Sequence, residues 1–383
     1  MTYSYAKLGD IATYINGYAF KPKDHGTKGL PIIRIQDLTG SSNDRGYYAG
    51  EYPSKIEINN GDVLISWSAS LGVYVWNKGK ALLNQHIFKV KFDKKDIDKD
   101  YFVYAVRFNL TKLKQLTHGA TMKHVVKKDF ENVLIPYPSL KRQREIAYVL
   151  DKLERNLTQK SQELDKLDEL IKARFVELFG DLTTNNRGWK TENFSCVFEN
   201  ITSSKRILKS EWKSNGIPFL RVRDLVQLSE KEVLNNEFFI SSELYSRLSD
   251  NDGVPKNGDI LVSATSTLGK CHIVNSNEKL YFKDADVLRF RPSNKINAVY
   301  FTECMNDHFI QGQIEHNLGV TTVKHFTIKA AKSILIRIPP LSLQNKFANF
   351  VQQVDKSKFE NIVYLNKTLS MKILSQLGDV SRD

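Results

Sequence analysis

The chain has 383 residues, 41% of them hydrophobic and 11% aromatic, and carries a formal net charge of +13. This length predicts two or three domains, and this apolar content excludes a wholly disordered protein. The sequence contains no run of about 18 apolar residues and no signal peptide, so we expect a cytoplasmic protein with no membrane partner. The positive charge favours a polyanionic partner such as nucleic acid.

Residues 1–140 are predicted to form a first mixed α/β domain. Short apolar runs bounded by Pro, Gly and Asp predict strands, and aromatic and aliphatic residues at near-helical spacing predict one helix at 100–116. The predicted strands are 32–35, 63–66, 73–76 and 81–83, the last two joined by a turn at 77–80.

The composition changes at about residue 141. Residues 141–180 have an apolar residue at every seventh position and charged residues at most of the others, which predicts a long helix with a coiled-coil seam. Pro136 and Pro138 precede this helix, and Gly180 is placed to end it. The seam consists of Leu150, Leu153, Leu157, Leu164, Leu167, Ile171 and Leu178.

A second globular domain is predicted over 181–340, followed by a second long helix over 341–383. Each helix could bury its apolar stripe against a neighbouring domain. Pairing between the helices is more economical, because an exposed heptad seam is unstable in water, and we expect an antiparallel pair. A helix over 141–178 would be about 57 Å long and would space two binding faces. The second seam includes Val354, Ile362, Leu365, Leu369 and Ile373.

Three segments of the first domain recur in the same order in the second. GLPIIRIQDL at 29–38 returns as GIPFLRVRDL at 216–225, NGDVLIS at 60–66 returns as NGDILVS at 257–263, and TMKH at 121–124 returns as TVKH at 322–325. The period of about 190 to 200 residues is far longer than the roughly 20–50 residues of solenoid repeats. The repeat therefore predicts two related globular domains. Two similar binding domains in one chain suggest a target with two parts.

Several segments together resemble the specificity subunit of type I restriction–modification systems, over nearly the whole chain. KLGDI at 7–11 is similar to the family's domain opening, and GATMKHVVKKDF at 119–130 to the segment that closes a target recognition domain. IPYPSLKRQ at 135–143 resembles the entry into the first long helix. RFVELFGD at 174–181, followed by Gly188 and Trp189, resembles the passage into the second domain.

The resemblance implies two target recognition domains separated by two long helices that form an antiparallel coiled coil. Such a subunit does no chemistry and reads a bipartite, asymmetric double-stranded DNA sequence in the prokaryotic cytoplasm. Its helices bind two methyltransferase subunits, which use S-adenosylmethionine to methylate adenine. Restriction subunits that use ATP and Mg can join the complex, so no cofactor is expected in this chain itself.

Two repeated segments contain candidate base readers. Alternation along the predicted strands would put Arg34 and Gln36 on one face, and Arg221 and Arg223 on its second copy. Arg reads guanine and Gln reads adenine in the major groove, so the difference between Gln36 and Arg223 fits two domains with different targets. Arginine recurs at the same position of both segments, as Arg34 and Arg221. We therefore expect these two residues to belong to the scaffold and to pair with Asp37 and Asp224.

Further candidate DNA contacts lie in polar loops and basic turns. Small hydroxyl residues after a strand can approach sugar and phosphate, and a Gly-x-Thr-x-Lys-His segment offers backbone amides, a hydroxyl and a charge. The alternatives are a plain hydroxyl-rich turn, a structural turn and a solvated basic surface. These candidates are Ser66, Ser68, Lys78, Thr121, Lys123, His124, Lys205, Arg206, Thr265, Ser266, Lys270, Thr322, Lys324 and His325.

The sequence contains no motif that indicates catalysis or a metal site. It has no Asn-Pro-Pro-Tyr methylation motif, dinucleotide-binding fingerprint or P-loop. The three cysteines, Cys196, Cys271 and Cys304, are too far apart for a zinc site or a disulfide framework. The repeat, together with the resemblance above, predicts a DNA specificity subunit. The alternatives are a protein–protein scaffold that binds no DNA and an unrecognised DNA enzyme.

Overall fold

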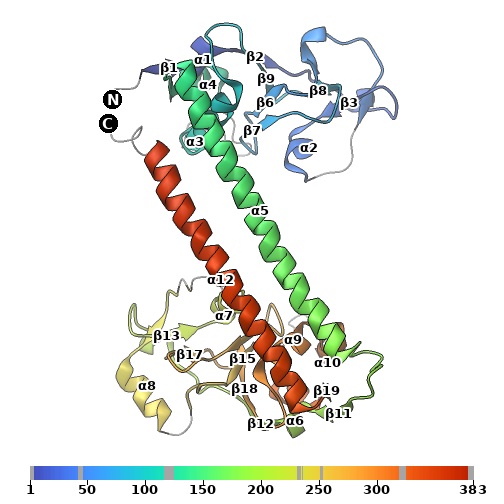
Figure 1. Cartoon of the computed structure of the whole chain (residues 1–383), viewed down its shortest axis with the longest axis vertical. Helices are drawn as coiled ribbons and strands as arrows, with labels where there is room; N and C mark the ends of the chain where they lie inside the picture. The colour runs from blue at the N-terminus through green and yellow to red at the C-terminus, as the bar shows by residue number, and fades with distance from the viewer. Residues whose placement is uncertain are drawn as a thin grey trace. The chain divides into compact units, whose positions relative to one another are not determined.

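The computed structural model describes residues 4–41, 46–115, 125–230, 234, 236–250, 253–318 and 325–377, without the side chains of 111–115, 318 and 364–377 (Figure 1). The chain divides into two compact units. Unit 1 comprises Met1–Ser161 and Tyr364–Asp383, and unit 2 comprises Gln162–Val363. None of the helices within the described ranges is long and apolar enough to cross a membrane.

Unit 1 combines three small sheets with a few helices. Its strands form a β2-β9-β6-β7 sheet, a β4-β3-β8-β5 sheet and a β1-β10 pair. The strands are β1 (Tyr5–Lys7), β2 (Thr13–Asn16), β3 (Leu30–Ile33), β4 (Tyr47–Tyr48), β5 (Glu57–Ile58), β6 (Val63–Ser66), β7 (Gly72–Val75), β8 (Ala81–Leu83), β9 (Ile87–Lys91) and β10 (Leu134–Pro136). The helices are α1 (Leu8–Ile11), α2 (Ile35–Thr39), α3 (Lys99–Gln115) and α4 (Lys127–Glu131), with short 3₁₀ turns at Pro22–Asp24 and Ser54–Ile56.

Unit 2 repeats this plan. Its sheets are β12-β18-β15-β16, β14-β13-β17 and β11-β19. The strands are β11 (Lys190–Asn193), β12 (Phe198–Ser203), β13 (Ile217–Leu220), β14 (Phe239–Ile240), β15 (Ile260–Ser263), β16 (Cys271–Ile273), β17 (Tyr281–Phe282), β18 (Val287–Pro292) and β19 (Leu335–Ile338). The helices are α6 (Phe194–Val197), α7 (Val222–Ser229), α8 (Ser242–Ser249), α9 (Ala298–Asn306), α10 (His308–Leu318) and α11 (Ile328–Ser333), with a 3₁₀ turn at Lys209–Glu211.

The strand pairing confirms the internal duplication. In unit 1, β3 pairs antiparallel with β4 and parallel with β8. In unit 2, β13 pairs antiparallel with β14 and parallel with β17. These strands come from the most similar segments of the repeat, so similar residues occupy similar places in both units.

Two long helices complete the fold, α5 (Leu140–Phe179) and α12 (Leu341–Leu377), drawn green and red in Figure 1. Within unit 2 they pack against each other, because the rings of Phe175 and Phe347 are in contact and Lys358 pairs with Asp168. A later position on α12 thus meets an earlier position on α5, so the two helices run antiparallel there. The predicted antiparallel pair is confirmed for this part of the chain.

The helix seams also join the cores of the units. Leu150 and Leu153 are buried, and Leu150 belongs to the same core cluster of unit 1 as Phe102 and Phe130. Ile171 and Val354 are buried in the unit 2 core. The two expectations for the seams, pairing with each other and packing on a domain, therefore both hold. As a result, each long helix is shared between the units instead of forming a separate segment between domains.

One strand prediction needs correction. Residues 32–35 are not all strand, because β3 ends at Ile33 and α2 starts at Ile35. The predicted strands 73–76 and 81–83 are confirmed as β7 and β8, which lie in two different sheets. The predicted helix 100–116 is confirmed as α3 from Lys99 to Gln115, and Leu116 lies outside the described residues.

Candidate nucleic-acid interface

The first turn of α7 is fixed by an aspartate that binds the residue before the helix. The backbone N–H of Arg221 donates to Asp224 Oδ2 at 2.9 Å, and Arg221 Nε donates to the same oxygen at 3.1 Å. Asp224 is fully buried. A carboxylate at the third helical position satisfies a backbone donor that the helix leaves open and complements the helix dipole. The predicted scaffold pairing of Arg221 and Asp224 is confirmed.

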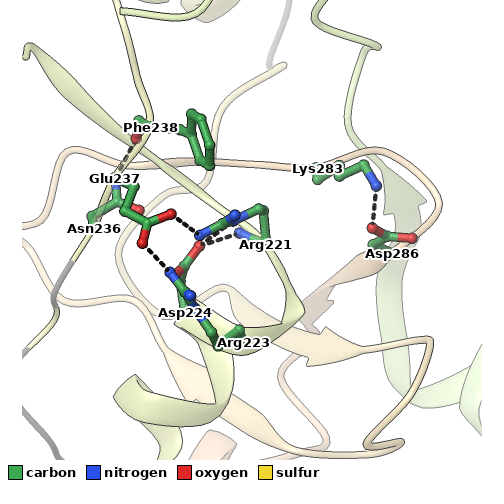
Figure 2. Close-up of polar contacts among 8 residues, drawn as sticks. All are labelled: Arg221, Arg223, Asp224, Asn236, Glu237, Phe238, Lys283 and Asp286. Atoms are coloured by element: carbon green, nitrogen blue, oxygen red, sulfur yellow. Dashed lines mark hydrogen bonds and ion pairs between the residues drawn. The ribbon is translucent and has the colours of Figure 1, made fainter. Parts of the chain in front are cut away.

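A second carboxylate holds two arginines side by side (Figure 2). Glu237 Oε2 accepts from Arg221 Nη2 at 3.2 Å, and Glu237 Oε1 lies 3.2 Å from Arg223 Nη2. The positive charge and hydrogen bond of Arg223 hold the pKa of Glu237 below its usual value, so the carboxylate is ionised at neutral pH. The result is a cluster of two positive and two negative charges in which Asp224 is buried and Arg223 and Glu237 are exposed.

An aromatic ring supports this cluster from one side. The Arg221 guanidinium lies 4.4 Å from the ring centroid of Phe238, a cation–π contact. Arg221 has 26% of its side chain exposed, whereas Arg223 has 56% exposed. Arg221 is therefore a supporting residue, and Arg223 presents its guanidinium to solvent.

Unit 1 repeats the supporting part of this arrangement. The backbone N–H of Arg34 donates to Asp37 Oδ2 at 2.9 Å, and Arg34 Nε lies 3.7 Å from that oxygen. Asp37 is buried, and the pairing predicted for the two residues is confirmed. Gln36, the counterpart of Arg223, is exposed in the first turn of α2.

The alternation predicted for these residues is wrong. Arg34 and Arg221 each precede a helix, and Gln36 and Arg223 lie inside its first turn, so the side chains follow helical rather than strand geometry. The exposed position still differs between the two units while the capping position stays the same. This is the pattern expected of one scaffold with two different contact surfaces.

A second group of predicted residues meets around a turn between β17 and β18. His325 is joined to Thr265 by a β-bridge, and His325 Nε2 lies 2.6 Å from the carbonyl oxygen of Ala285. Because a carbonyl only accepts, Nε2 must carry a proton. Thr265 Oγ1 in turn lies 3.5 Å from Asp286, which binds Lys283 Nζ at 2.6 Å.

A cleft lined by both polar and apolar side chains adjoins this turn. It has a volume of about 480 Å³ and is lined by Ser203, Ser204, Asp284, Ala285, Leu288, His325, Thr327, Ile328 and Lys329. Lys205 and Arg206 follow this lining and are exposed. The backbone of Lys205 exchanges two hydrogen bonds with the hydroxyl of the buried Tyr281, at 2.9 and 3.1 Å. The turn that carries both cations is therefore held firmly.

The remaining predicted DNA contacts differ in their exposure to solvent. Ser66 and Ser68 are buried, and the Ser66 hydroxyl donates to the carbonyl of Ser70 at 2.5 Å. Ser66 therefore supports the loop, and neither side chain faces solvent in this conformation. Ser266 and Lys78 are exposed, and Lys270 lies 3.5 Å from Glu230.

Several predicted residues cannot be placed. Thr121, Lys123, His124, Thr322 and Lys324 lie outside the described residues. On α12 the backbone is described through Leu377, but the side chains of Leu365, Leu369 and Ile373 are not.

The remaining seam residues of the long helices are described. Leu157 and Leu164 are half-buried, Leu167 and Leu178 pack against the unit 2 core, and Ile362 is 42% exposed. The seam residues are thus most buried where they pack into the core of a unit.

Sequence reasoning missed Glu237, Phe238 and Lys283. Glu237 and Phe238 directly precede the short strand β14, and Lys283 follows β17. Neither strand is marked by a repeated motif. Glu237, Phe238 and Lys283 come near the start of α7 only because β13 pairs with both strands. No local sequence signal could therefore have identified them.

No group of three or more His, Cys, Asp or Glu residues within the described ranges could hold a metal ion. Cys271 and Cys304 are buried and Cys196 is exposed, all three as free thiols. Burial raises the pKa of the Cys271 and Cys304 thiols, as expected for core residues.

Comparison with known proteins agrees with this arrangement. The family model for the type I restriction modification DNA specificity domain matches twice, over residues 2–169 and 186–370. The specificity subunit of the type I restriction enzyme EcoBI from Escherichia coli is 25% identical, over 91% of this chain and 78% of its own. That of MjaVIII from Methanocaldococcus jannaschii is 23% identical, over 79% and 74%.

Solved structures share the fold. The S subunit of a type I restriction-modification system from M. genitalium superposes with a TM-score of 0.61 at 15% identity, covering 98% of this chain and 96% of that one. A chain from a study of type I restriction-modification complex assembly gives 0.56 at 17% identity, covering 98% and 95%. The two family matches confirm the predicted function of DNA sequence recognition and do not favour the scaffold alternative. The chain therefore belongs to the family of type I restriction-modification DNA specificity subunits, with one target recognition domain in each unit.

Proposed function

We propose that each unit reads one half of a bipartite, asymmetric DNA target and that the chain itself catalyses no reaction. One observation carries this proposal. The two units repeat the same capping pair, Arg34 with Asp37 and Arg221 with Asp224, but expose Gln36 in one and Arg223 in the other. A shared scaffold with different exposed side chains favours two different half-sites, since base edges are distinguished by side-chain donors and acceptors.

The long helices are proposed to recruit two methyltransferase subunits. Large apolar side chains remain exposed along them, and burying these against a partner would be favourable. They are Tyr148, Leu170 and Val176 on α5, and Leu341, Phe359 and Ile362 on α12. The recruited subunits would bind S-adenosylmethionine, and restriction subunits, where present, would bind ATP and Mg. The complex would act in the cytoplasm, where prokaryotic DNA lies.

Net charge supports the DNA partner. With +13 on the chain and exposed cations such as Lys205 and Arg206, binding should release counterions and weaken as salt rises. The scaffold alternative has no such requirement, because contacts between protein surfaces of mixed polarity depend much less on salt.

The test uses the chain purified with its methyltransferase subunit. Adenine methylation is mapped at sequence resolution on a library of random duplexes, with S-adenosylmethionine supplied. We expect a split motif with a fixed spacer, and replacing unit 2, residues 162–363, by the corresponding unit of a relative should change one half only. Methylation without a split motif, or a change in both halves, would contradict the proposal.

A further inference from the structure

We propose that Arg223 is the residue of unit 2 that reads a guanine in its half-site, and that Glu237 is the residue that positions it. The proposal rests on the function proposed above and deepens it to one side chain and one base. Its basis is the cluster of Arg221, Arg223, Asp224 and Glu237 at the start of α7 (Figure 2).

The cluster leaves one edge of the Arg223 guanidinium open. Arg223 Nε lies 3.6 Å from Asp224 Oδ1, and Arg223 Nη2 lies 3.2 Å from Glu237 Oε1. Both carboxylates therefore use the side of the guanidinium that bears Nε. No described residue pairs with Nη1 of Arg223, so the end of the planar group, formed by Nη1 and the second N–H of Nη2, faces outward. That end offers two parallel donors, the arrangement that matches guanine O6 and N7.

The carboxylates also restrict the orientation of this edge. Glu237 is fixed because its other oxygen binds Arg221 at 3.2 Å, and Arg221 is fixed in turn by the buried Asp224 and by the ring of Phe238. A free arginine loses rotamer entropy when it binds a base. An arginine already held in place loses less, which increases both affinity and discrimination.

The charge balance favours a base over a phosphate. The two arginines and the two carboxylates of the cluster cancel each other. A phosphate placed at Arg223 would come close to the ionised Glu237 and be repelled, whereas a guanine edge presents neutral acceptors. Exposed cations without a carboxylate nearby, such as Lys205 and Arg206, fit the phosphate role better.

Comparison of the two units separates this cluster from the scaffold. The capping pair recurs in unit 1, as Arg34 and Asp37, but the other two positions do not. Gln36 replaces Arg223. Gly46 replaces Phe238, since the carbonyl of Gly46 accepts from Ile32 as that of Phe238 accepts from Phe219. Residue 45, which precedes Gly46 as Glu237 precedes Phe238, is an arginine in the sequence and lies outside the described residues. The exposed arginine, the carboxylate beside it and the ring that supports Arg221 therefore have no identical counterparts in the sequence of unit 1, as expected of residues that serve one half-site.

The test is sequence-resolved methylation by the complex of the full chain with its methyltransferase subunit. Arg223→Gln should lower the preference for one guanine, in one half of the motif, about tenfold or more, and leave the other half unchanged. Arg223→Lys should cause the same loss, because it keeps the charge but not the planar pair of donors. Arg247→Gln, which removes an exposed arginine from α8 in the same unit, is the matched control and should leave the motif intact.

The variant Glu237→Gln tests whether Glu237 positions Arg223 or only stabilises the fold. Removal of this negative charge should raise affinity for all DNA while lowering the preference for the same guanine. A purely structural role would not move the two quantities in opposite directions. Circular dichroism of each variant checks that the fold is kept.

Three results would overturn the proposal. If Arg223→Gln weakens every position equally, Arg223 contacts phosphate. If the motif is unchanged, the ion pair only stabilises α7. If the wild-type complex shows no split motif at all, the proposed function fails as well, and the wild-type measurement alone reveals this.

Discussion

The rings of Phe175 and Phe347 meet edge to face, with centroids 5.4 Å apart and planes at 72°. They come from the two long helices and lie in the core of unit 2 together with Phe179 and Tyr300. Edge-to-face contact is a favourable arrangement for aromatic rings. The helices are therefore part of this unit's core and stabilise it directly.

Phe347→Ala should destabilise unit 2 strongly. Phe347 is fully buried, so truncation leaves a cavity and should cost about 3–5 kcal/mol. Hydrogen exchange of the β15 and β18 amides measures this for unit 2 by itself. Phe359→Ala, at a side chain that is 67% exposed on the same helix, is the control and should change exchange little. Equal effects of the two substitutions would show that the aromatic contact does not stabilise the unit.

Asp224→Ala should destabilise unit 2, and Asp37→Ala should destabilise unit 1. Each substitution removes a buried acceptor of a backbone N–H and of an arginine, with an expected cost of about 1–3 kcal/mol. Asn at the same positions keeps one acceptor and should cost less. Urea unfolding of the full chain measures the free energy of unfolding, which should increase from the Ala variant to the Asn variant to the wild type. An effect no larger than that of the exposed Asp250→Ala would refute the capping role.

The double substitution Lys205→Ala with Arg206→Ala should weaken DNA binding without changing its sequence preference. Loss of phosphate contacts lowers the slope of log affinity against log salt by about 0.9 for each contact. We expect a decrease of about 1–2 in a salt titration by fluorescence anisotropy. Arg247→Ala removes a charge elsewhere and should leave the slope unchanged. A change in the methylated motif would mean that these residues read bases.

The cysteines should differ in reactivity. The thiolate is the reactive form, and burial raises the pKa of the Cys271 and Cys304 thiols, so little thiolate forms at neutral pH and access is blocked as well. Iodoacetamide at pH 7.5 should modify only Cys196 in the native protein and all three cysteines after denaturation, as read by mass spectrometry. Rapid native labelling of Cys271 would show that the β15–β16 region opens readily.

Much of the fold could be predicted from sequence because its signals are local or periodic. The apolar seam residues of α5 and α12 predicted both helices, and each begins within a few residues of its predicted start. Segments such as 63–66 had strong strand composition and form β6. The partners of the strands could not be predicted, because pairing such as β3 with β8 depends on chain closure over many residues.

The end of β3 was misplaced for a specific physical reason. Ile32, Ile33 and Ile35 all favour a strand, but Asp37 accepts the backbone N–H of Arg34 and starts a helix instead. Arginine is not a usual residue before a helix, so Asp37 was the only local sign that a helix begins here.

The candidate DNA contacts were hard to predict for a related reason. Composition alone cannot tell whether a serine such as Ser66 turns toward the backbone or toward solvent.

The shared helix α5 has a consequence for recombination. Ile146, Ala147 and Leu150 belong to the core of unit 1, whereas Ile171, Phe175 and Phe179 belong to that of unit 2. A crossover at the start of the helix would pair one parental domain with core residues that evolved for another. A crossover near Ser161, where the helix passes from one unit to the other, would keep each of these core residues with its own unit. Functional hybrids should therefore have their junctions in the middle of the helix and not in the loops beside it.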